Sequence, residues 1–173
     1  MLRPGLPEDG MPKGGEPASR VPHHLKQAGR SVGIDFTGLT DRTPNTEVFH
    51  ATIKFLQDDV KVDREAVTSF HEAVFEDYYT LGVFPSKEAL VLAAKKAGNP
   101  TVLTKVESLL LDDNNSDELE RLCRQVRQEA SEASSRGISG VPSFAFGEDS
   151  GKPAFSGAQS TSVFVGYLTE HAK

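Results

Sequence analysis

The spacing of the apolar residues changes once along this chain, and the change lies at Gly137. Between His23 and Arg136 apolar residues recur every three or four positions, which is typical of the buried face of an α-helix. After Gly137 the apolar runs are short and are separated by polar turns, which is typical of β-strands. Because helices are grouped in one part of the chain and strands in another, the sequence predicts an α+β fold.

Three regions follow from this pattern and from the distribution of proline. Residues 1–22 hold five of the ten prolines, and we expect an extended arm there because proline breaks helices and weakens strands. Residues 23–136 are expected to form a helical domain, and residues 137–173 a β-hairpin followed by a helix. The predicted elements of this last region are strands over Val141–Phe146 and Pro153–Phe155, a turn over 148–152, and a helix over Thr161–His171.

Capping residues and glycines mark where the helices of the middle region begin and end. A side-chain oxygen at a helix start accepts a free backbone N–H, and glycine ends a helix because it readily adopts a positive φ. The predicted starts are His23, Asn45, Asp63, Ser86, Pro100 and Ser116. The predicted ends are Gly33, Gly82, Gly98 and Gly137.

The overall charge and the cysteine count exclude several classes of protein. The formal net charge is −6, which argues against nucleic acid or an anionic membrane as partner, since both attract basic surfaces. No apolar run approaches the roughly 20 residues that span a bilayer, and the first residues lack the apolar segment of a secretory signal. A single cysteine excludes an internal disulfide and a cysteine-rich metal site. We therefore expect a cytoplasmic protein that binds no metal.

The dipeptide Val141–Pro142, at the start of the first predicted strand, is the clearest candidate for a binding site. A peptide bond before proline adopts the cis form far more readily than other peptide bonds, and we expect a cis bond here. A trans proline at the start of an edge strand is the alternative. A cis bond would leave the N–H and C=O of Val141 unpaired in their own sheet, where an extended peptide or a thiol ligand could add as a further strand.

Several segments, taken in order, resemble the DsbA-like thioredoxin-fold family, and its FrnE-like branch best. That branch is related to 2-hydroxychromene-2-carboxylate isomerases and kappa-class glutathione transferases. The segments are Leu2–Gly10, Ala28–Phe36, Arg42–Thr46 with His50, Gly137–Phe144 and Phe155–Gln159. The resemblance covers nearly the whole chain and implies a thioredoxin-like fold with an inserted all-helical domain.

The family's activity is thiol–disulfide exchange by a Cys-x-x-Cys motif at a helix N-terminus, facing a cis-proline loop. The resemblance implies that Val141 and Pro142 form this loop and hold the substrate. It also places the first strand and the Cys-x-x-Cys helix before Met1, so both are missing and no residue of the chain is a catalytic candidate. The expected function is that of an incomplete or redox-inactive thiol–disulfide oxidoreductase. Its expected partner is a thiol- or disulfide-containing protein or a small thiol.

Two further segments are candidates for binding. Residues 157–160 precede the last helix, where free N–H groups can hold a carboxylate such as that of glutathione; a plain turn and cap is the alternative. Asn45 is a helix cap, a pocket residue, or both. No cofactor is expected, apart from glutathione as a candidate ligand. The predicted substrate-binding residues are Gly140, Val141, Pro142, Gly157, Gln159 and Asn45.

Two other functions stay open. The chain is either a non-catalytic protein-binding module or a relative of the glutathione-dependent isomerases and transferases, some of which use serine in place of cysteine at the active helix. Without its first strand the hairpin keeps an open edge, through which we expect the chain to self-associate.

Cys123 and the histidines have plainer interpretations. Cys123 shares the apolar face of a predicted helix with Leu119 and Leu122, so we interpret it as a core residue and not as a reactive thiol. His50 and His71 lie on apolar-leaning faces of neighbouring helices without the spacing of a metal site. For these two residues, packing is favoured over metal binding.

Overall fold

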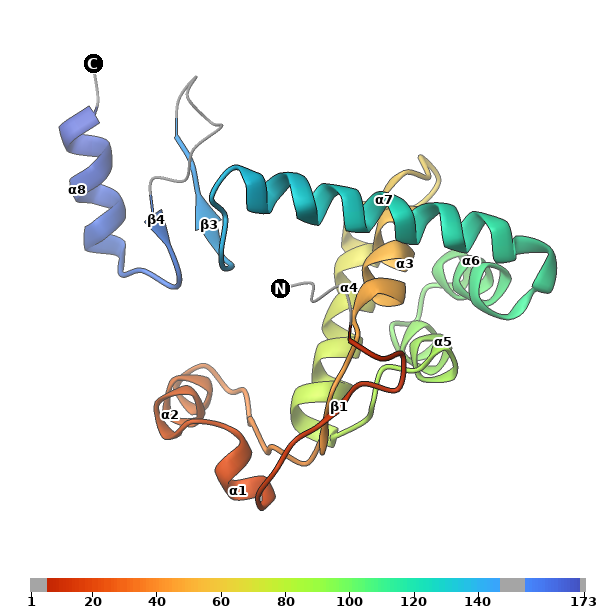
Figure 1. The fold of residues 1–173 in the computed structure, drawn as a ribbon, viewed down its shortest axis with the longest axis horizontal. Helices are drawn as coiled ribbons and strands as arrows, with labels where there is room; N and C mark the ends of the chain where they lie inside the picture. The colour runs from red at the N-terminus through yellow and green to blue at the C-terminus, as the bar shows by residue number, and fades with distance from the viewer. Residues whose placement is uncertain (1–5, 147–154, 172–173) are drawn as a thin grey trace. The chain divides into compact units, whose positions relative to one another are not determined.

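The structure, a computed structural model, describes residues 6–146 and 155–171 (Figure 1). The predicted turn over residues 148–152 and the beginning of the second predicted strand lie outside the described residues. The chain divides into two compact units, a helical unit of residues 2–127 and a hairpin unit of residues 128–173. Each unit is described by itself.

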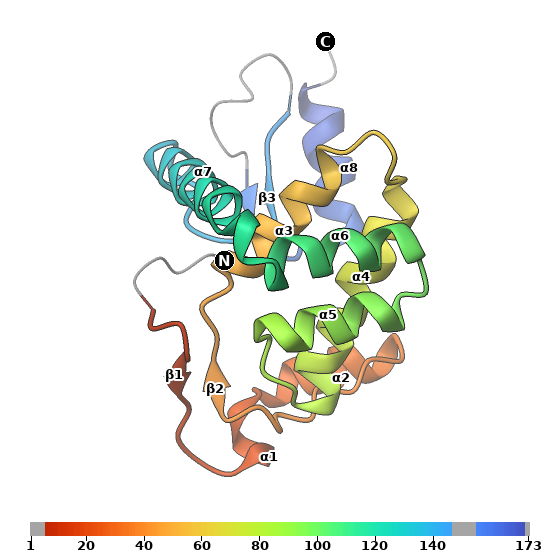
Figure 2. The same cartoon turned by 90° about the vertical axis from the view of Figure 1, so that its right-hand side faces the viewer.

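Five α-helices make up most of the helical unit. They are α3 (Glu47–Gln57), α4 (Arg64–Glu76), α5 (Lys87–Lys96), α6 (Pro100–Leu111) and α7 (Ser116–Ser135), the last of which continues into the hairpin unit. A π-helical turn, η1 (Asp77–Leu81), follows α4, and a 3-10 turn, η2 (Asp113–Asn115), precedes α7. Helix α5 packs against both α4 and α6, as Figure 2 shows. No helix within the described ranges is long and apolar enough to cross a membrane.

The helix starts follow the predicted caps. Asp63 accepts the N–H of Ala66 at 2.7 Å, and Ser86 accepts the N–H of Ala89 at 3.2 Å, which confirms both as caps. Pro100 is the first residue of α6, where the lack of an N–H costs nothing, and Asn99 provides the cap. Glycine ends the helical segments with positive φ at Gly82 (76°), Gly98 (78°) and Gly137 (82°), as predicted.

One apolar face of each helix forms the core of the helical unit. Leu56 and Phe70 are fully buried, and burying a side chain of this size stabilises the fold by about 1.5–3 kcal/mol. The other large side chains with almost no exposure come from α5, α6 and α7: Leu90, Val102, Val106 and Leu122. Cys123 lies in the same cluster, which confirms its interpretation as a core residue.

The first part of the helical unit differs from the expected extended arm in two places. Strand β1 (Met11–Pro12) pairs antiparallel with β2 (Arg42–Thr43), and Pro17–Arg20 form a single helical turn, α1. Proline is compatible with the helical turn because Pro17 lies in its first turn, where a backbone N–H has no partner within the helix. Proline is also compatible with the strand pair, because each strand of a two-stranded sheet has an outer edge at which no N–H has to be bonded. The helix α2 (His23–Ser31) follows and confirms the predicted start at His23.

The hairpin unit contains two short strands and one helix after the end of α7. Strand β3 (Ser143–Phe144) pairs antiparallel with β4 (Phe155–Ser156), with Ser143 opposite Ser156 and Phe144 opposite Phe155. Of the first predicted strand, Val141–Phe146, only Ser143 and Phe144 are paired within the described ranges. The second predicted strand, Pro153–Phe155, is described only from Phe155 onward, so its predicted length is not tested. Helix α8 covers Thr161–His171, the predicted range.

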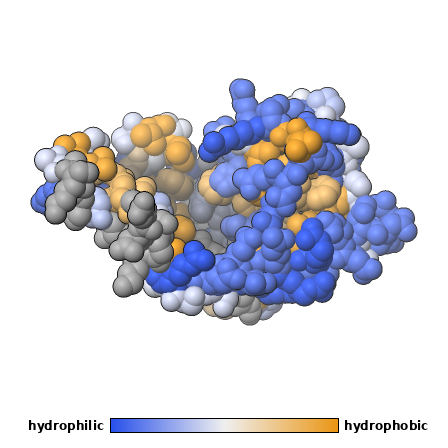
Figure 3. Space-filling model, turned by 90° about the horizontal axis from the view of Figure 1, so that it is seen from above, coloured by the Kyte–Doolittle hydropathy of each residue, from blue (hydrophilic) through white to orange (hydrophobic). Residues whose placement is uncertain are grey.

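Aromatic rings hold the hairpin unit together. Phe155 lies against Phe144 (5.3 Å between ring centroids), Phe146 (5.7 Å), Phe164 (5.2 Å) and Tyr167 (5.7 Å). Phe144 and Phe146 reach one face of the sheet because side chains alternate along a strand, while Phe164 and Tyr167 share one face of α8 because they are three residues apart. All five rings are only half-buried, and apolar side chains (orange) lie open on this unit in Figure 3.

Candidate functional site

The loop before β3 holds three of the predicted binding residues. The peptide bond between Val141 and Pro142 is cis. Val141 is 66% exposed, and Pro142 is exposed as well. A Cβ atom placed on Gly140 would meet nothing within 4 Å, so the approach to the loop is open on that side.

A hydrogen bond joins this loop to the turn after β4. The N–H of Gly157 donates to the C=O of Pro142 at 2.8 Å, one position beyond the Ser143–Ser156 pair. Gly157 has a φ of 84°, a left-handed conformation that favours glycine. The structure therefore brings Gly140, Val141, Pro142 and Gly157 together at one end of the hairpin.

Gln159 lies in the same turn. Its side-chain amide donates to the C=O of Ser156 at 2.9 Å, so the side chain closes the turn that leads into α8. The hydroxyl of Ser160 lies 2.7 Å from that of Ser162. These contacts are those of a turn and helix start, and glutathione binding at this turn stays a prediction.

The backbone of Val141 lies just outside the paired part of β3. Within residues 6–146 and 155–171, neither its N–H nor its C=O makes a hydrogen bond. An exposed main chain that continues the line of a strand offers a donor and an acceptor to an added strand. The loop can therefore hold an extended polypeptide by main-chain hydrogen bonds.

Two serines beside the loop were not among the predicted site residues. The hydroxyl of Ser156 lies 3.5 Å from that of Ser143 across the β3–β4 pair. Both point to the same face because they are opposite each other in the register. Which residues lie opposite each other depends on the exact position of the hairpin turn. The sequence does not determine that position to a single residue, so this serine pair could not be predicted.

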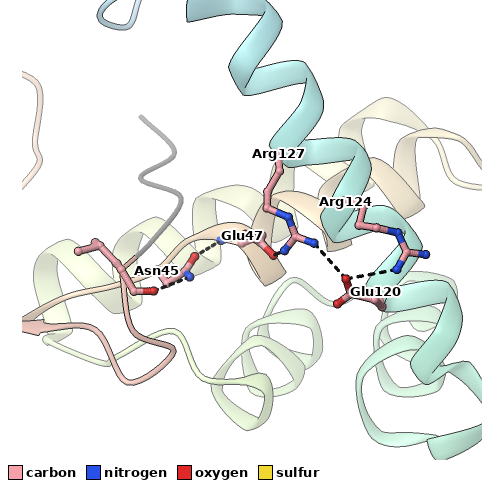
Figure 4. Close-up of polar contacts among 6 residues, drawn as sticks. Asn45, Glu47, Glu120, Arg124 and Arg127 are labelled. Atoms are coloured by element: carbon pink, nitrogen blue, oxygen red, sulfur yellow. Dashed lines mark hydrogen bonds and ion pairs between the residues drawn. The ribbon is translucent and has the colours of Figure 1, made fainter.

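Asn45 belongs to the helical unit and orders the start of α3 (Figure 4). Its side-chain oxygen accepts the N–H of Glu47 at 3.0 Å, and its amide donates to the C=O of Leu6 at 3.0 Å. Asn45 thus satisfies one free N–H of the helix and also ties the N-terminal segment to it. The predicted cap is therefore displaced by one residue: Thr46 occupies the cap position without a side-chain hydrogen bond, while Asn45, just before it, accepts the first N–H of α3.

An ion-pair network links the start of α3 to α7. Arg127 contacts the carboxylate of Glu47 and, at 3.0 Å, that of Glu120, which also contacts Arg124 at 3.4 Å (Figure 4). The Glu47 side chain is only 13% exposed, so Arg127 compensates a partly buried charge.

Cys123, on α7, lies next to this network and is not reactive. It is 5% exposed. Burial, and after it the negative charge of Glu47, raise the pKa of the Cys123 thiol from 9.0 to about 11. A thiol attacks a disulfide only as the thiolate, and reactive cysteines have lowered rather than raised pKa values. Cys123 therefore cannot serve as the nucleophile of an exchange reaction near neutral pH.

The two histidines singled out in the sequence are packed against aromatic rings. The ring centroid of His71 lies 5.4 Å from that of Phe49 and 4.0 Å from that of Phe75. The ring centroid of His50 lies 5.5 Å from that of Phe49. Desolvation lowers the pKa of both histidines, and for His71 the charge of His50 lowers it further. In the part of the chain that the structure describes, no group of three or more histidine, cysteine, aspartate or glutamate residues could hold a metal ion.

Comparison with known families finds a match to the DSBA-like thioredoxin domain over residues 8–169. Comparison with curated proteins and with solved structures finds no match. The matched range includes the helices of the helical unit, the loop at Val141–Pro142, and nearly all of α8.

Proposed function

This chain belongs to the DSBA-like thioredoxin domain family, and we propose that its own part in that family's thiol–disulfide chemistry is to bind an extended polypeptide substrate. The fold is α+β and thioredoxin-like. The proposed substrate is a thiol- or disulfide-containing protein, and the proposed binding element is the loop at Gly140–Pro142. The finer placement in the FrnE-like branch, with the helical unit as its insertion, is part of the same proposal.

One observation supports this function above the others. The hydrogen bond from Gly157 to Pro142 anchors the loop to the end of the β3–β4 pair, while the preceding residue, Val141, is exposed and its N–H and C=O make no hydrogen bond within the described residues. Hydrogen bonds between main-chain groups do not depend on the side chains of the bound peptide. They therefore suit substrates that have a cysteine in common but otherwise differ in sequence.

We also propose that this chain does not carry out the exchange step by itself. At pH 7 a thiol whose pKa is about 11 is ionised to roughly one part in ten thousand, and burial keeps substrate away from it. The one cysteine of the chain is thus unsuited to the attack. In an assay of disulfide reduction, the purified chain is expected to give no turnover above the Cys123→Ser variant.

Binding of a labelled peptide tests the proposal. The probe is an extended peptide that contains S-methylcysteine, and the readout is its fluorescence anisotropy. Val141→Pro removes the N–H, and because an unpaired acceptor costs about 1–3 kcal/mol, affinity should fall about five- to hundredfold. Val141→Ala is the matched control, since it keeps the N–H, and it should stay within about twofold of the unaltered chain.

Two results would contradict the proposal. One is the absence of saturable binding by the unaltered chain, and the other is an equal loss of affinity in both variants. Sedimentation of the free chain must accompany the titration, because we propose that self-association through the same edge competes with the peptide. Thermal melts establish that both variants remain folded.

A further inference from the structure

A cavity lies within the helical unit, where the segment after β1 meets α1, α2 and η1. Its volume is about 220 Å³. About seven water molecules occupy this volume in liquid water. Pockets for drug-sized ligands are larger, at roughly 300–1,000 Å³. The residues of its wall that carry the argument are Lys13, Arg20, Leu25, Phe36, Tyr78 and Tyr79, which we call the basic pocket.

Two cations form the polar side of the basic pocket. The ammonium of Lys13 donates to the hydroxyl of Tyr78 at 2.8 Å and lies 4.9 Å from the centre of its ring. The guanidinium of Arg20 is held in place by backbone carbonyls: Nε donates to that of Gly15 at 3.1 Å and Nη1 to that of Leu39 at 3.1 Å. These bonds fix the direction of both positive charges before any ligand binds, which lowers the entropic cost of binding.

No carboxylate lines the basic pocket among the residues that the structure describes. Two cations thus line the cavity, while no anion is among its described lining residues. Burial and the charge of Arg20 lower the pKa of the Lys13 ammonium, and the charge of Asp41 only partly opposes this. A negative group placed between Lys13 and Arg20 would offset their repulsion.

Apolar and aromatic side chains also line the basic pocket. Phe36 and Tyr79 meet edge to face, with 5.5 Å between their ring centroids, and Leu25 of α2, which is partly exposed, is a further lining residue. Tyr78 is held against β2 by its hydroxyl, which donates to the C=O of Arg42 at 3.3 Å. The cavity thus combines two cations held by hydrogen bonds with aromatic side chains, and such a combination of polar and aromatic groups is usual in small-molecule sites.

We infer that the basic pocket binds a small organic acid, with its carboxylate between Lys13 and Arg20 and its apolar body against Phe36 and Tyr79. The size of the cavity fits a single ring or a short chain and excludes a nucleotide or a folded peptide segment. This site is separate from the proposed peptide-binding loop and does not depend on it.

Benzoate and benzamide test the inference, because they have the same shape and differ in charge. On the unaltered chain, titration calorimetry should show saturable binding of benzoate and at least about tenfold weaker binding of benzamide, the difference expected from one lost charge-assisted hydrogen bond. This comparison needs no variant to fold. Equal binding of the two probes, or no saturation by benzoate, would overturn the inference.

Two lysine variants locate the site. Lys13→Gln removes the charge but keeps a donor for Tyr78, and it should weaken benzoate binding about fivefold or more. Lys87→Gln removes an equal charge from the exposed start of α5, away from the cavity wall, and should leave binding within about twofold. If Lys13→Gln has no effect, or if both variants weaken binding equally, benzoate is bound elsewhere or by general charge attraction, and the inference fails.

Discussion

At the scale of single residues, the backbone conformation of glycine fixes several turns. Gly82 ends η1 with a φ of 76°, and a Cβ atom there would lie 2.5 Å from the Cβ of Leu39. Gly98 ends α5 with nearly the same φ, 78°, but a Cβ atom there would meet nothing within 4 Å. An alanine at Gly98 would therefore have only the free-energy cost of the left-handed conformation, whereas an alanine at Gly82 would add the cost of a steric clash with Leu39.

The first prediction uses this pair. Gly98→Ala should lower the free energy of unfolding by about 1 kcal/mol, the cost of a left-handed residue with a side chain. Gly82→Ala should lower it by at least about twice as much, because the backbone of η1 must also shift. Urea unfolding of both variants measures the difference, and equal losses would contradict the role given to the Leu39 contact.

Cys123 gives a second prediction at this scale, through pH. Its thiol has a pKa of about 11 in the folded chain and 9.0 as the ordinary value, so the folded state holds the proton more tightly. The resulting stabilisation is complete below pH 9 and is lost as the pH rises towards 11. The melting temperature should thus fall more steeply over this interval in the unaltered chain than in Cys123→Ala. Parallel curves would show that the thiol is not buried.

At the scale of elements, the ion pairs of α7 differ in what they stabilise. Arg127 faces the partly buried carboxylate of Glu47 on α3, whereas Arg124 has a 62% exposed side chain and contacts Glu120 on its own helix. Exposed pairs within one helix contribute little, and removing the partner of a buried charge costs more.

Arg127→Ala should therefore lower the free energy of unfolding by more than Arg124→Ala does, because it removes the partner of a partly buried carboxylate. Arg124→Ala, its matched control, should lower it by less than about 0.5 kcal/mol. Chemical unfolding at low and at high salt measures both. If the two variants lose the same amount, the link between α3 and α7 does not depend on Glu47.

The aromatic cluster of the hairpin unit is the other element-scale feature. Phe155 contacts four of its rings, so Phe155→Ala should destabilise this unit by about 2–3 kcal/mol, somewhat less than a fully buried phenylalanine. Val165→Ala, on the exposed side of α8, should cost less than about 0.5 kcal/mol. Near-ultraviolet circular dichroism reports the loss of ring packing. An unchanged spectrum for Phe155→Ala would contradict the role of this cluster.

Helices with a capping residue and an apolar face could be predicted from the sequence. Elements that lack these two features could not. Asp63 and Ser86 start helices because each has a side-chain oxygen next to a free N–H, a local relation that needs no tertiary structure. The pairing of β1 with β2 joins residues about 30 positions apart. The composition of residues 1–22, taken alone, points to an arm because it carries no information on those contacts.

The same distinction holds for the candidate site. The loop at Val141–Pro142 was predicted because a proline before a short strand is visible in the sequence itself. The basic pocket was missed, since Lys13, Arg20 and Tyr78 come from separate segments and show no common spacing. Asn45 was predicted as a cap, a pocket residue, or both, and its contacts lie at the start of α3, next to the cap position that Thr46 occupies.

At the scale of the whole molecule, the two units are built differently. The helical unit has a core of buried side chains, whereas the five rings of the aromatic cluster in the hairpin unit are half-buried and Val141 is exposed. A small unit of one strand pair and one helix gains stability from whatever covers it. The proposed function assigns that role to an extended substrate at the loop.

The amide proton of Val141 provides the most direct test of this account. An S-methylcysteine peptide is titrated into the isotope-labelled chain, and the shift and hydrogen exchange of this amide are followed by nuclear magnetic resonance. The account predicts a saturable shift and slower exchange at Val141, because the N–H gains an acceptor from the peptide. Binding of the peptide with an unchanged Val141 amide would contradict it.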